Sequence, residues 1–101
     1  MRTVYLGTSE FAATVLRRLA ASPHRPALVV SPPDRRQGRD RRVAPPPAAV
    51  AARALGLELA QAENVNEQEA LERIRAAEPE VVLVCAFGQL IREPLLSRVL
   101  M

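Results

Sequence analysis

Residues 3–19, TVYLGTSEFAATVLRRL, combine a short β-prone run, a glycine and an apolar pattern with helical spacing. The first residues of this stretch favour a strand that ends at Gly7. Apolar side chains then recur three and four residues apart, at Phe11, Ala12, Val15, Leu16 and Leu19. The stretch therefore predicts a strand, a tight turn and a helix.

Three further apolar runs predict more strands. Residues 27–30 are preceded and followed by prolines, which exclude a continuing helix. Residues 57–59 predict a third, short strand, and residues 81–87, the most hydrophobic run, predict a central strand.

Helices are predicted between these runs. One covers residues 48–55 and ends at Gly56, which can adopt a left-handed conformation. The next begins at the capping pair Asn66 and Glu69 and is closed by Pro79. Pro94 can occupy the first turn of a last helix that carries Leu95, Leu96, Val99 and Leu100.

Strands that alternate with helices through short connections predict a parallel sheet with right-handed crossovers and helices on both faces. The expected fold is a Rossmann-like α/β domain with strand order 3-2-1-4. This order leaves residues 81–87 at an edge, so the sheet is incomplete at its last strand. Because proteins usually cover apolar edges, we expect the natural domain to continue past Met101, or the uncovered edge to self-associate.

Composition limits the chain to one compact domain or part of one, with 101 residues and 49% apolar content. No apolar run reaches the roughly 18 residues that cross a bilayer, and no signal-peptide pattern is present, so a cytoplasmic protein without membrane contact is expected. Cys85, the single cysteine, lies in an apolar run and is interpreted as an inert thiol. His24, the single histidine, lies in a turn between prolines and is interpreted as solvated.

The segment DRRQGRDRR at residues 34–42 holds the whole formal net charge of +3. Its charged side chains are Asp34, Asp40 and the arginines Arg35, Arg36, Arg39, Arg41 and Arg42. A dense basic segment on a neutral scaffold suits a protein that holds a polyanion at one place, and nucleic acid is the natural candidate. The alternative is a solvated charged loop without a binding role.

The turn at residues 7–12, GTSEFA, occupies the place of a dinucleotide-binding fingerprint but matches it poorly. Ser9 stands where a glycine would allow close approach of a pyrophosphate, and Glu10 would repel one. We interpret this turn as the capped start of a helix rather than a nucleotide site.

Residues 85–91, CAFGQLI, lie at the carboxyl end of the strand predicted at residues 81–87. Open α/β folds usually bind ligands at the carboxyl ends of their strands. Gly88 permits a turn whose main-chain groups could bind a flat heterocycle, with Phe87, Leu90 and Ile91 as apolar walls. From the residues alone, a plain transition from strand to loop is an equal alternative.

Three segments together carry a family resemblance: YLGTSEFA at 5–12, PPDRRQGRDRR at 32–42 and VLVCAFGQLI at 82–91. In this order they resemble the methionyl-tRNA formyltransferase family along the whole chain. Ser9, Arg36 and Asp40 depart from the commoner family pattern. The resemblance identifies residues 1–101 as the amino-terminal part of a formyltransferase-type Rossmann-like domain.

The resemblance implies transfer of a formyl group from 10-formyltetrahydrofolate to the amino group of methionyl initiator tRNA, without a metal. It assigns the tRNA acceptor stem to Arg35, Arg36, Arg39, Arg41 and Arg42, with Arg39 as the first choice for the key contact. It assigns the folate-binding wall to Phe87, Gly88, Gln89, Leu90 and Ile91. The family's catalytic Asn-x-His does not occur in this sequence, so no catalytic residue is assigned and the chain alone is expected to be inactive.

Three other functions remain open at this point. The chain could be a standalone RNA-binding α/β module, a domain for a nucleotide cofactor, or part of another folate-dependent formyltransferase that acts on a small amine. The basic insertion after the second strand favours tRNA over a small amine as the substrate.

Overall fold

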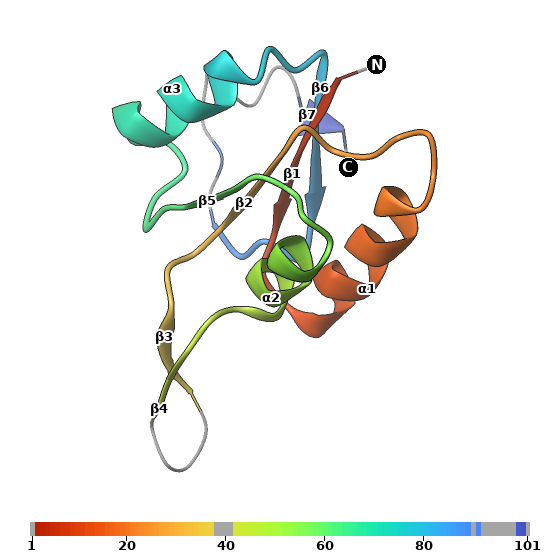
Figure 1. The fold of residues 1–101 in the computed structure, drawn as a ribbon. Helices are drawn as coiled ribbons and strands as arrows, with labels where there is room; N and C mark the ends of the chain where they lie inside the picture. Colours follow the sequence, from red (N-terminus) through yellow and green to blue (C-terminus); the bar gives the residue numbers. More distant parts are fainter. Residues whose placement is uncertain (1, 38–41, 90, 92–98, 101) are drawn as a thin grey trace.

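The computed structural model describes residues 2–37, 42–89, 91 and 99–100. In this part of the chain the main element is a five-stranded parallel sheet in the order β5-β2-β1-β6-β7 (Figure 1). Its strands are β1 (Thr3–Gly7), β2 (Leu28–Ser31), β5 (Leu59–Gln61), β6 (Val81–Cys85) and β7 (Val99–Leu100). The helices that connect them are α1 (Glu10–Ala20), α2 (Pro47–Ala54) and α3 (Gln68–Ala76). A separate antiparallel pair, β3 (Arg35–Gln37) and β4 (Arg42–Ala44), interrupts the connection between β2 and α2.

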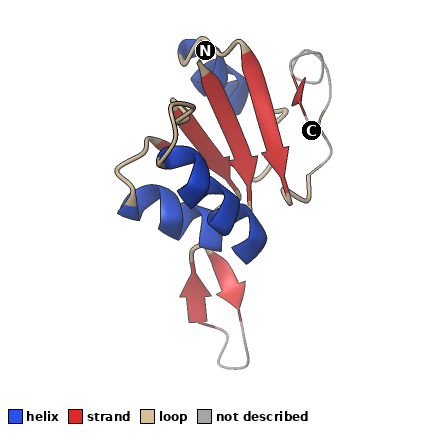
Figure 2. Cartoon of the chain, turned by 90° about the vertical axis from the view of Figure 1, so that its right-hand side faces the viewer, coloured by secondary structure: helices blue, strands red, loops and turns tan. Residues whose placement is uncertain are grey.

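Two apolar cores lie on opposite faces of the sheet, because successive side chains of a strand point to opposite sides. Val4 and Leu6 of β1 pack in the core that contains Ile74 of α3. Tyr5 packs in the other core, with Leu16 of α1 and Ala48 of α2. The predicted strand order 3-2-1-4, here β5-β2-β1-β6, and the helices on both faces are confirmed (Figure 2).

The predicted cap of α1 is also confirmed. The Ser9 side chain accepts a hydrogen bond of 3.4 Å from the main-chain N–H of Ala12. Glu10 lies in the first turn and two arginines in the last, each at the end where its charge complements the helix dipole.

Two predicted boundaries near the middle of the chain are wrong. The third strand begins at Leu59 rather than Leu57, because the N–H of Leu57 still donates to Ala52 and its side chain is buried against α2. The N-cap residue of α3 is Glu67 rather than Asn66, and the N–H of Asn66 donates to Asn64 Oδ1 in the preceding turn. Local side-chain bonding within the 64–66 turn replaces the predicted cap.

The carboxyl end of the chain differs from the prediction of a last helix. Val99 and Leu100 form β7, which pairs in parallel with Val82 and Leu83 of β6. The open edge of β6 offers unpaired main-chain donors and acceptors, which the two residues of β7 satisfy. The edge expected to be uncovered is therefore covered at these positions, and the predicted helical residues 94–98 lie outside the described part. Among the described helices, none is long and apolar enough to span a membrane.

Candidate functional site

The arginine-rich segment forms the stem of a hairpin. β3 and β4 pair with Arg35 opposite Ala44, Arg36 opposite Val43, and Gln37 opposite Arg42. This hairpin extends away from the sheet and the helices (Figure 1). Arg39 and Arg41, predicted to contact tRNA, belong to residues 38–41, which lie outside the described part. The described part of the segment is therefore a paired stem rather than an irregular loop.

Arg35 is the stem arginine whose side chain is described, and it is exposed. Its guanidinium lies 3.8 Å from the Glu63 carboxylate, with 56% and 73% of the two side chains exposed. An ion pair this exposed contributes little to stability, so it holds Arg35 only loosely. A phosphate could therefore replace Glu63 as its partner at small cost.

The hairpin returns to the domain through a rigid proline segment. Pro46 is buried, and Pro47 is the first residue of α2. The N–H of Ala48 then donates to the carbonyl of Thr8 (3.2 Å), which joins the start of α2 to the loop after β1. Because proline fixes φ, this return path leaves the chain few conformations.

The loops after β1 and β6 are joined by a hydrogen bond. Thr8 Oγ1 donates to the main-chain oxygen of Phe87 at 2.6 Å. On both sides of Phe87 the backbone has positive φ, +48° at Ala86 and +81° at Gly88. A positive φ is rare for alanine and often marks a functional turn.

The predicted folate-binding residues differ in their surroundings. Phe87 is 3% exposed and belongs to the core, whereas Gly88 is exposed. The Gln89 side chain accepts from the N–H of Val65 (2.8 Å) and donates to the carbonyl of Ala62 (3.2 Å). Ile91 packs against the core, and Leu90 lies outside the described residues. Gly88 is therefore exposed between a buried phenylalanine and a glutamine whose side chain is hydrogen-bonded to the domain.

A hollow of about 240 Å³ lies between the hairpin legs and the loop after β1. Arg35 and Thr8 both line it, together with four prolines from the legs of the hairpin: Pro32, Pro33, Pro46 and Pro47. Since Thr8 also holds Phe87, the hairpin stem and the Phe87 turn are on the same side of the molecule.

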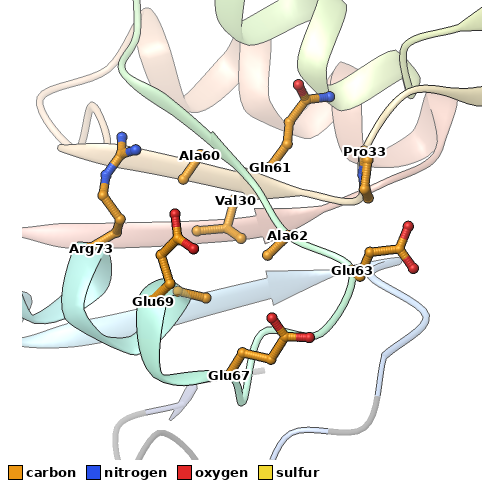
Figure 3. Close-up of a pocket in the computed structure, with 10 residues that line it drawn as sticks. Val30, Pro33, Ala60, Gln61, Ala62, Glu63, Glu67, Glu69 and Arg73 are labelled. Atoms are coloured by element: carbon orange, nitrogen blue, oxygen red, sulfur yellow. The ribbon is translucent and has the colours of Figure 1, made fainter.

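A second pocket, of about 230 Å³, was not expected from the sequence (Figure 3). Val30, Ala60 and Ala70 contribute apolar groups, and Glu63, Glu67, Glu69 and Arg73 contribute charged ones. Only the density of acids between residues 63 and 69 could have indicated it.

Tyr5 and Cys85 meet beneath the site. The Tyr5 hydroxyl donates to the carbonyl of Ala12 (2.7 Å). Burial raises the pKa of Tyr5 well above its ordinary value, and the neighbouring Cys85 thiol raises it further. The core beneath the site thus contains a phenol whose proton is held by burial. Within the described part of the chain, no group of three metal-ligating side chains comes together.

Comparison with known proteins gives consistent results. A family model described as formyl transferase matches residues 1–100. The methionyl-tRNA formyltransferase of Syntrophomonas wolfei is 44% identical over 91 residues, which cover 90% of this chain and 29% of that protein. The methionyl-tRNA formyltransferase of Chloroflexus aggregans is 42% identical over 97 residues, which cover 96% of this chain and 31% of that protein. The chain thus spans about 30% of the length of these curated relatives.

Solved structures support the same architecture at low sequence identity. Phosphoribosylglycinamide formyltransferase from Bacillus halodurans superposes with a TM-score of 0.68 at 10% identity, over 98% of this chain and 54% of that one. The enzyme of the same name from Anaplasma phagocytophilum gives 0.68 at 12% identity, over 98% and 47%. At these identities the likeness concerns the fold alone.

Proposed function

Since this chain belongs to the formyl transferase family, we propose that the intact protein transfers a formyl group from 10-formyltetrahydrofolate to the amino group of methionyl initiator tRNA. The identity of about 40% to methionyl-tRNA formyltransferases supports this choice of substrates. In this proposal the chain supplies the tRNA-binding hairpin and one wall of the folate site.

The basic hairpin is the observation that carries the proposal. Residues 34–42 hold the whole net charge of +3, and the stem formed by β3 and β4 extends away from the sheet. A projecting stem with arginines can reach into a groove of an RNA helix, where guanidinium groups bind phosphates in a bidentate manner. No aromatic residue occurs in residues 34–42, which favours backbone contacts over base stacking. The proposed tRNA contacts are Arg35, Arg36, Arg39, Arg41 and Arg42.

The turn after β6 is the proposed folate contact, through Phe87, Gly88, Gln89, Leu90 and Ile91. The positive φ of Ala86 and Gly88 turns main-chain groups out of the sheet, where they can pair with the polar edge of a pterin. Arg35 and Thr8 line the same hollow, and Thr8 also binds the main chain of Phe87. This arrangement supports a folate site beside the tRNA contact, as transfer between the two substrates requires.

The chemistry needs groups that the proposal does not assign to these 101 residues. Attack of an amine on a formyl carbon requires a proton acceptor and a donor to the developing oxyanion. The family motif Asn-x-His is absent from the sequence. We therefore expect the purified chain to bind its substrates without forming formylmethionyl-tRNA, and product at the rate of an intact enzyme would contradict this.

Binding of methionyl initiator tRNA to the purified chain tests the proposal. Replacement of Arg39, Arg41 and Arg42 by alanine should weaken binding about tenfold or more, because each of these arginines makes a charge-assisted bond to a phosphate in the proposal. The matched control replaces Arg17, Arg18 and Arg75, which are exposed on α1 and α3 and change the net charge equally. The control should retain most of the affinity.

Equal reductions in affinity for the two triple variants would show that the chain attracts RNA by net charge alone, which contradicts the proposal. Tight binding of NAD in place of a reduced folate would instead support a nucleotide-cofactor domain.

A further inference from the structure

The direction in which the hairpin leaves the domain is determined at its two legs. β3 and β4 pair with each other and form a sheet of their own. The second leg, residues 45–47, is stiffened by prolines. The first leg, residues 32–34, follows the end of β2 and contains Pro32 and Pro33, and it also accepts side-chain hydrogen bonds.

Gln61 supplies those bonds. It is the last residue of β5 and pairs with Ser31 of β2. Its Nε2 donates to the carbonyl of Pro32 (3.2 Å) and to Asp34 Oδ1 (2.8 Å). Its side chain points toward α2 and away from the acidic side of the pocket (Figure 3). One amide group therefore binds both a main-chain and a side-chain acceptor of the first leg.

The other end of this amide is occupied as well. Arg53 of α2 donates from Nη2 to Gln61 Oε1 at 3.1 Å. With the oxygen engaged by a guanidinium, both N–H groups of the amide face the first leg. Glutamate at this position would have no donor for Pro32 and would place a carboxylate beside that of Asp34. The site is thus specific for an amide.

We propose that Gln61 is a positioning residue that sets the direction of the arginine hairpin and thereby its fit to tRNA. The tRNA part rests on the proposed function, whereas the orientation of the hairpin does not. Gln61 itself lies in the sheet and need not contact RNA. The bonds join segments of the hairpin, the sheet and α2, so their removal frees the first leg without removing a basic side chain.

Spin labels test the orientation without RNA. Cysteines replace exposed Val43 on the hairpin and exposed Ala76 on α3, in a chain in which Cys85 is changed to alanine. Pulsed electron resonance should give a narrow label-to-label distance distribution, and Gln61→Ala should broaden it. Gln68→Ala is the control, because this exposed glutamine bonds only to Glu72 of its own helix among the bonds described.

Two substitutions of Asp34 isolate a single bond. Asp34→Asn and Asp34→Ala remove the same charge, but asparagine keeps an Oδ1 acceptor for Gln61. Asp34→Asn should retain the narrow distribution and Asp34→Ala should broaden it. For tRNA, Asp34→Ala should bind about twofold to fivefold more weakly than Asp34→Asn, the range expected for one exposed hydrogen bond. Thermal unfolding of each variant is the control for retention of the fold.

The outcomes separate this proposal from the proposed function. An unchanged distance distribution in both Gln61→Ala and Asp34→Ala would overturn the positioning role. If the distance distribution broadened but the two Asp34 variants bound tRNA equally well, the link between hairpin direction and RNA binding would be overturned. If the unchanged chain bound no tRNA, the proposed function would fail, while the distance measurement would still decide whether Gln61 orients the hairpin.

Discussion

The hydroxyl of Thr8 donates a hydrogen bond of 2.6 Å to the main-chain oxygen of Phe87, across 79 positions of sequence. β1 and β6 are neighbours in the sheet, with Gly7 opposite Cys85, so this bond links the loops at their carboxyl ends. It holds the carbonyl of Phe87 while the residues on both sides adopt positive φ. The turn proposed to bind folate is therefore fixed before any ligand arrives.

Thr8→Val should loosen this turn. Valine has nearly the same shape but no donor, so the carbonyl of Phe87 loses its partner at a cost of about 1 kcal/mol in the free energy of unfolding. We also expect weaker binding of tetrahydrofolate, measured by calorimetric titration. Thr8→Ser keeps the hydroxyl and is the control. Equal folate affinities for the valine and serine variants would show that the bond does not organise the site.

The glycines at 7 and 88 should respond in opposite order to alanine and asparagine. A Cβ at Gly7 would lie 2.9 Å from Ala12 Cβ and 2.9 Å from Tyr5 Cε2, so asparagine should be worse than alanine, which itself should cost about 1–3 kcal/mol. At Gly88 no atom of the described residues, apart from the two chain neighbours, would lie within 4 Å of an added Cβ, but φ is +81°. Asparagine tolerates this region better than alanine, so Gly88→Asn should cost less than Gly88→Ala. Denaturant unfolding of the four variants gives the order, and the same order at both sites would contradict the structure.

Alkaline pH should destabilise the protein through Tyr5. Its pKa is raised in the folded state, so above its ordinary value of about 10 the unfolded chain loses the proton while the folded chain keeps it. The folded chain then binds more protons than the unfolded chain, and stability falls as pH rises. Because Tyr5 is the single tyrosine, the absorbance of tyrosinate reports the deprotonation of Tyr5 directly.

Tyr5→Phe provides the comparison. Its free energy of unfolding should fall less steeply above pH about 10, since the phenol is absent. Tyrosinate absorbance that appeared near the ordinary pKa in the folded protein would contradict the buried, hydrogen-bonded position of Tyr5.

Much of the fold could be predicted because it depends on local pattern. The alternation of apolar runs and helical periodicity placed β1, α1, β2 and β6, and short connections implied the parallel order. β7 could not be predicted, because Val99 and Leu100 also fit a helical pattern and only the unpaired edge of β6 selects a strand.

The candidate site was predictable in charge but not in geometry. The density of arginines indicated a binding segment. The antiparallel stem has no periodic apolar signal, because Arg35, Arg36 and Gln37 are all polar. The bonds of Gln61 join three segments distant in the sequence, and no local pattern reveals such an arrangement.

The most direct test of the central claim is the salt dependence of the affinity for methionyl initiator tRNA. For the unchanged chain, log Kd should rise linearly with the logarithm of the salt concentration. The variant in which Arg39, Arg41 and Arg42 are alanine should give a shallower line. Its slope should be smaller by about 0.7–0.9 for each phosphate that the variant no longer neutralises. Parallel lines for the two proteins would show that the hairpin arginines do not neutralise tRNA phosphates, and would contradict the account.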